Sequence, residues 1–242
     1  MKRLKKDSKK AVSHIEMAIS FAIFVMFVFF MLFYLKPIRN QNISDVLIDA
    51  IMNGLENRAK SQLIEIPVNL KVSVAEDCFS IRNPFNTTNT ENLFVKDKNS
   101  KLLKFTLTGE NISIEKSEDF YYIFFSSETF ESTVPSFVSC RELNESEYVF
   151  GAAKTYELFS ISQLESIQQD YINNYDELKN EFRFPVNYDF NIKITLLATK
   201  QDLFTMETTK PEKVEVIARE IPIEILNHDG SILNAILNIQ VW

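Results

Sequence analysis

Residues 64–74 read IEIPVNLKVSV, a nearly strict alternation of apolar and polar side chains. Successive side chains of a β-strand point to opposite faces of a sheet, so this period of two predicts a strand with one buried face. Further short strands are predicted over 92–96, 101–108, 111–115, 121–126, 149–159 and 188–199. We therefore expect antiparallel sheet beyond residue 64.

The C-terminal part adds one hairpin and one helix to this sheet. Segments 214–226 and 232–241 alternate like strands and flank the sequence NHDG, in which Asp-Gly is typical of a tight hairpin turn. A helix is predicted over 162–184, with SQLE at 162–165 as a capping box and Pro185 as its stop. A loop is predicted over 205–211.

Before the strands lies an amphipathic helix. From Ser44 the apolar residues Leu47, Ile51, Leu55 and Ala59 recur every four positions, and polar residues fill the other side up to about Gln62. We expect the apolar stripe to pack on the domain that follows.

The N-terminal region is apolar on every face. Met17 to Leu35 is a run of 19 residues without a charge, about 28 Å long as a helix and close to the ~30 Å hydrocarbon core of a bilayer. Six basic residues precede it, which predicts a cytoplasmic N-terminus and an external C-terminus. A helix buried in a soluble domain and a removed secretory signal are the alternatives. The latter is disfavoured because no small-residue cleavage pattern ends the run.

The expected fold class is therefore α+β: an N-terminal transmembrane helix, then an antiparallel β-rich extracytoplasmic domain with one additional long helix. The predicted division is a basic leader (1–11), a transmembrane helix (12–36), a juxtamembrane amphipathic helix (37–63) and the α+β domain (64–242). The predicted location is the cell membrane, with a single pass.

Charge separates the two ends of the chain. Residues 1–16 carry six basic and two acidic side chains, a net of +4, so the remainder carries -7 - 4 = -11. A basic head suits the cytoplasmic side of a membrane, and an acidic body does not suit a nucleic-acid binder.

The front edge of the apolar run, KKAVSHIE at residues 9–16, resembles the processing site of type IV pilin precursors, especially the archaeal class III signal-peptide group. In that family a basic leader is cut after a small residue, and a Glu commonly stands fifth in the mature chain. A cut between Ala11 and Val12 would place Glu16 there. The sequence departs from the family in having Ala before the cut, where many members have Gly, and Val after it, where class III members often have Gln.

The resemblance implies a non-enzymatic filament subunit, major or accessory, whose apolar helices bundle. Its implied partners are the membrane, copies of itself or related pilins, a prepilin peptidase and an assembly platform. In the bundle, the new amino group of Val12 could pair with Glu16 of a neighbouring subunit. The alternative is an uncut single-pass surface protein whose external domain binds a ligand or an envelope partner.

Two cysteines, Cys78 and Cys140, lie in the part predicted to be external, where an even number favours a disulfide. Two buried free thiols are the alternative. The motif N-x-[ST] occurs at Asn42, Asn86, Asn111 and Asn144, all after the apolar run, which is compatible with glycosylation.

Sequence signals of catalysis are missing. The chain has no Walker A motif, no dinucleotide-type glycine run and no G-x-S-x-G. Its histidines are His14 and His228, which excludes a histidine-rich metal site, and no serine is marked as a partner for His228. We therefore expect no catalytic residues, no metal and no cofactor.

Overall fold

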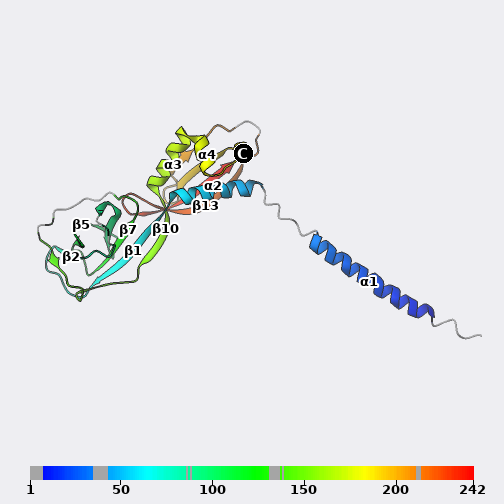
Figure 1. Cartoon of the computed structure of the whole chain (residues 1–242), viewed down its shortest axis with the longest axis horizontal. Helices are drawn as coiled ribbons and strands as arrows, with labels where there is room; N and C mark the ends of the chain where they lie inside the picture. The colour runs from blue at the N-terminus through cyan, green and yellow to red at the C-terminus, as the bar shows by residue number, and fades with distance from the viewer. Residues whose placement is uncertain are drawn as a thin grey trace, which may run out of the picture. The chain divides into compact units, whose positions relative to one another are not determined.

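The computed structural model describes residues 8–34, 43–85, 87, 89–130, 137, 139–210 and 214–242. The chain divides into two compact units, Met1–Val46 and Leu47–Trp242, which are treated separately below. The first unit holds helix α1 (Ser8–Tyr34) and the start of α2 (Ile43–Ala59). The second unit contains the rest of α2 and all of the strands (Figure 1).

No helix in the described part of the chain is both long and apolar enough to span a membrane. The side chains of α1 are described from Glu16 to Met31. The predictions of a transmembrane helix over 12–36 and of a single-pass membrane protein with an external domain are therefore wrong.

The described strands form two sheets. The larger sheet has the order β12-β11-β14-β13-β10-β1-β7-β3-β4, and β9 also pairs with β1. Its strands are β1 (Lys60–Leu70), β3 (Leu93–Asp97), β4 (Leu102–Leu103), β7 (Phe120–Ser126), β9 (Tyr148–Phe150), β10 (Lys154–Ser160), β11 (Phe190–Leu196), β12 (Asp202–Met206), β13 (Ile217–Leu226) and β14 (Ile232–Val241). The smaller sheet has the order β5-β6-β2-β8, with β2 (Cys78–Arg82), β5 (Phe105–Thr108), β6 (Asn111–Glu115) and β8 (Arg141–Glu142).

The sequence had led us to expect antiparallel sheets, but each of the two sheets contains a parallel pair of strands. In the larger sheet β10 pairs with β13 in parallel, at Phe159–Ile225 and Ser160–Leu226. In the smaller sheet β2 and β8 are parallel. These pairings join segments far apart in the chain, and the alternation within a strand carries no information about them.

Helices α2, α3 (Ile161–Asn173) and α4 (Tyr175–Glu181) share a core with strands β11 to β14. The apolar stripe of α2 is buried there, which confirms the prediction that it packs on the following domain. Figure 1 shows α2 running beside β13, and Arg219 of β13 donates a hydrogen bond to Asp49 of α2 at 2.8 Å. The helices therefore cover one face of this half of the sheet.

Gly54 allows α2 and the end of α4 to approach closely. A Cβ atom at Gly54 would lie 2.4 Å from ring atoms of Phe182, far inside normal contact distance. Phe182 is itself buried and stacks with Phe190 of β11. A larger residue at position 54 would therefore have to displace a core ring.

We predict that Gly54→Ala lowers the free energy of unfolding by about 1–3 kcal/mol, because the clash outweighs the better helix propensity of alanine. Urea denaturation measures this change. The double variant Gly54→Ala, Phe182→Leu should recover part of the loss relative to Phe182→Leu alone. An additive effect of the two substitutions would contradict the clash as the cause.

The smaller sheet packs on one face of the β1-β7-β3 part of the larger sheet. Its core contains Phe79, Ile81, Ile112 and Ile114 from the smaller sheet. The larger sheet contributes Val68, Leu93, Val95, Tyr121 and Ile123. The side chains of β1 and β7 therefore alternate between this core and the opposite face, as the period of two predicts.

Cys78 and Cys140 form a disulfide, with Cα atoms 4.9 Å apart. Cys78 begins β2 and Cys140 lies directly before β8, so the bond joins the two parallel strands of the smaller sheet. The predicted disulfide is confirmed, and two free thiols are excluded.

Replacing both cysteines by serine should lower the free energy of unfolding by about 4 kcal/mol, because the bond closes a loop over a separation of 62 residues. Thermal unfolding with and without reductant tests this. Reductant should lower the Tm of the natural chain and leave that of Cys78→Ser, Cys140→Ser unchanged. Equal Tm values of the natural chain in both conditions would contradict the prediction.

Several predicted elements need correction. The helix predicted over 162–184 is two helices, interrupted at Asn174, whose backbone is not helical. Its N-cap is Ser160, whose Oγ accepts a hydrogen bond from the Gln163 amide at 3.2 Å, and not Ser162. The strand predicted over 101–108 is β4 and β5, which belong to different sheets. The predicted loop over 205–211 includes the end of β12.

The junction between the halves of the larger sheet is narrow. Only the two residue pairs between β10 and β13 connect them as strands in the described chain. Beside this junction, Lys96 of β3 donates a hydrogen bond from Nζ to the Gly230 carbonyl oxygen at 2.8 Å. Gly230 has φ +72°, and a Cβ atom there would meet the Phe94 ring at 2.8 Å. The turn of the β13–β14 hairpin thus rests on the β3 part of the sheet.

Candidate assembly surface

The described side chains of α1 form a helix surface that is apolar all round. From Met17 to Met31 all side chains except Ser20 are apolar, and all except Val25 are exposed. Phe21 is 68% exposed, Phe24 62% and Met26 78%, although they project from different sides of the helix. Contiguous exposed apolar surface of this kind marks an interaction site.

Glu16 is the one charged side chain in the described surface of α1, and it is exposed. It lies at the N-terminal edge of the apolar run. Ala11 and Val12 lie within α1, so the predicted cleavage bond is part of the helix, but their side chains are outside the described residues. Glu16 is four residues from Val12, about 6 Å along the helix axis.

The predicted glycosylation residues are scattered. Asn144 is exposed in a turn, where its side chain and backbone amide both hydrogen-bond to Glu147. Asn111 is half-buried at the start of β6, and its Nδ2 donates to Glu142 at 3.2 Å. Asn42 and Asn86 lie outside the described residues.

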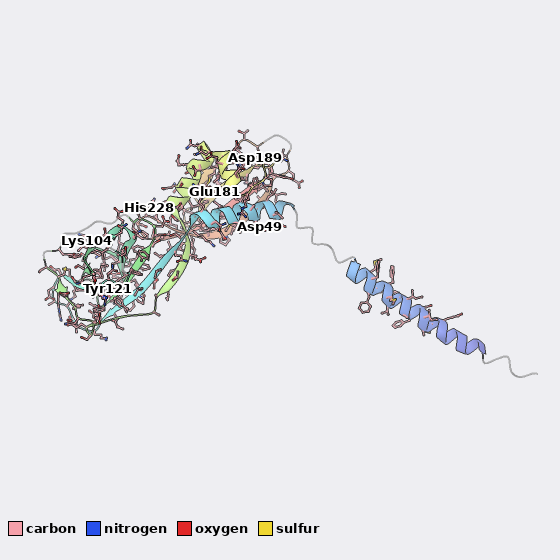
Figure 2. The ribbon with its side chains drawn as sticks, in the orientation of Figure 1. Asp49, Lys104, Tyr121, Glu181, Asp189 and His228 are labelled. Atoms are coloured by element: carbon pink, nitrogen blue, oxygen red, sulfur yellow. A yellow bond between two sulfur atoms is a disulfide. The ribbon has the colours of Figure 1, made fainter. Side chains whose placement is uncertain are left out.

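His228 lies in the turn between β13 and β14 (Figure 2) and pairs with Glu165 of α3 at 3.5 Å. Two nearby serines have other partners. Ser162 donates a hydrogen bond to Glu128, and Ser160 caps α3. No hydrogen bond joins His228 to a serine side chain among the described residues. The same part of the chain contains no group of three or more His, Cys, Asp or Glu residues that could hold a metal ion.

The sequence did not lead us to predict one candidate binding surface of the second unit, the open edge of strand β13. Strand β13 pairs with β14 along its whole length but with β10 only at its last two residues, so most of its other edge is open. Pro222 in the middle of the alternating run was the available signal, because proline in sheets is confined to edges, strand starts and bulges.

The described chain is thus a β-rich protein with four α-helices, one of which presents an apolar surface on all sides. Compared with known protein families, with curated proteins and with solved structures, it matches none.

Proposed function

We propose that this protein is a non-enzymatic, pilin-like subunit, or an accessory pilin, of a type IV pilus-like filament, and that its α1 helices bundle with one another. The observation that carries the proposal is the exposed apolar surface of α1 from Met17 to Met31. Its processing would follow the family that KKAVSHIE resembles, with a prepilin peptidase cutting after Ala11.

The physical argument starts from the free energy of apolar surface in water. At roughly 25 cal/mol per Å², leaving a run of exposed Phe, Ile and Met side chains uncovered is strongly unfavourable. A groove on one partner would cover one side of such a helix, whereas a bundle of like helices covers all of its sides at once. Surrounding copies of α1 meet this requirement without a second kind of partner.

In this proposal Glu16 sets the axial position of each α1 helix relative to its neighbour. Once the helices bundle, its carboxylate enters a low-dielectric environment and needs a partner, since an unpaired buried charge costs several kcal/mol. The α-amino group of a chain starting at Val12 would reach this carboxylate in a neighbouring helix that is displaced by about 6 Å along the bundle. An ion pair between them would fix how far one subunit is displaced along the bundle.

The arrangement of α2 also supports the proposal. In the pilin plan the lower half of the first helix docks on a β-sheet, and α2 shares its core with strands β11, β12, β13 and β14. The second unit would then be the part displayed on the outside of the filament.

The first test is the N-terminal residue of the protein isolated from its own cells, read by mass spectrometry. We expect the chain to begin at Val12. A chain that begins at Met1 would contradict the processed-subunit proposal.

The second test is Glu16→Ala in cells that make the filament. Loss of a buried ion-pair partner costs about 3–5 kcal/mol per contact, so we expect filaments to fall below detection in electron micrographs. The matched control is Glu110→Ala, which also removes an exposed carboxylate, and it should assemble normally. Both variants should keep the Tm of the natural chain. Normal filaments from Glu16→Ala would contradict the ion-pair account.

A further inference from the structure

Strand β13 presents a long open edge in the second unit. Its partner β14 occupies the other edge from Ile217 to Leu226, and β10 reaches it only at Ile225 and Leu226. Outside the β13–β14 and β10–β13 ladders, Ala218 and residues 220–223 make no backbone–backbone hydrogen bond with the described residues. An edge of this length is a template for another strand.

Pro222 shows which backbone groups face outward. In an antiparallel ladder, opposed residues alternate between pairs that exchange two hydrogen bonds and pairs that exchange none. Pro222 faces Ile236 and has no N–H to exchange, so this pair is of the second kind, and its carbonyl group points away from β14. By alternation, the N–H and C=O groups of Ala218, Glu220 and Glu224 point the same way.

The open edge borders a groove of about 480 Å³. The groove is lined by Ile221, Pro222, Ile223 and Glu224 of β13, by Met52, Glu56 and Lys60, by Glu157 and Phe159 of β10, and by Leu197 and Asn234. There is therefore room beside the outward-facing backbone groups, and the helix α2 does not fill it.

The side chains around this edge differ between the two faces of the sheet. Ile221 and Ile223 pack with the helix-covered core, and Met52 of α2 lies on the same side. Glu220 and Glu224 are exposed on the other face, and Glu157 is exposed across the groove. Lys60 is paired with Glu56 at 2.9 Å, whereas these three glutamates form no salt bridge with the described residues. From residue 220 to residue 224 the edge is therefore apolar on one side and acidic on the other, and Arg219, on the apolar side, donates a hydrogen bond to Asp49.

We infer that the edge of β13 from Ala218 to Glu224 binds an extended segment of another protein as an added strand, in which basic residues alternate with apolar ones. The repeat of outward N–H and C=O groups, about 7 Å apart, matches an extended backbone, whereas a helix uses its own backbone groups internally. Lysine or arginine side chains of the added strand would face Glu220 and Glu224, and its apolar side chains would face Ile221, Ile223 and Met52.

This inference does not depend on the proposed filament. The edge belongs entirely to the second unit, whereas the assembly surface belongs to α1. The test therefore uses the full chain carrying Glu16→Ala, so that the outcome does not depend on assembly.

The experiment compares three capped eight-residue peptides: alternating lysine and valine, the same sequence N-methylated at every residue, and alternating glutamate and valine. Fluorescence anisotropy at low salt measures binding, and hydrogen exchange locates it. We expect the lysine peptide to bind and to slow exchange of the Ala218, Glu220 and Glu224 amides. The other two peptides should bind at least about tenfold more weakly, because one lacks the donors and the other repels the glutamates.

Charge reversal supplies the matched control. Glu220→Lys with Glu224→Lys should invert the preference toward the glutamate peptide. Glu76→Lys with Glu110→Lys, which changes two exposed glutamates elsewhere by the same charge, should leave the preference unchanged. The inference is overturned if the lysine peptide does not bind, if it protects amides outside 218–224, or if both double variants behave alike. Protection of the same amides by self-association, without peptide, would also overturn it and assign the edge to a second copy.

Discussion

The second unit depends on the direct continuation of helix α2 into strand β1. Ala59 is the last residue of the helix and Lys60 the first of the strand, with no loop between them. β1 then pairs along both edges, with β10 and β9 on one side and with β7 on the other. Because α2 is buried in one core and Val68 of β1 in the other, neither can shift or rotate without moving the other.

The sequence predicted the elements whose signals are local. Periodicity predicted strand β1 and the apolar stripe of α2, and turn chemistry predicted the hairpin around Asn227 to Gly230. None of these signals depends on a tertiary contact. The first and last residues of the helix after β10 could not be predicted from such local signals. Two serines two positions apart both satisfy the pattern of a cap, and the choice of Ser160 over Ser162 depends on where β10 ends.

What the sequence could not predict was partnership between distant segments. Residues 101–108 were predicted as a single strand, yet β4 belongs to the larger sheet and β5 to the smaller one. The candidate surfaces show the same division. The apolar character of α1 and the place of Glu16 were legible in the sequence, whereas the prediction of a membrane span did not survive. The open edge of β13 was missed because whether a strand has a neighbour on each side depends on how distant segments pair, and its own sequence does not show this.

The narrow junction between β10 and β13 has an energetic consequence. Protein regions open locally in cooperative units, and the boundaries of such units fall where few interactions cross. Here two residue pairs, the contact of Lys96 with Gly230 and a small cluster around Phe94 and Leu226 join two halves that each have a larger core. The continuous backbone through β1 holds the halves together covalently while each retains its own stability. Local opening of one half is therefore transmitted to the other through these few contacts and through the junction of α2 with β1.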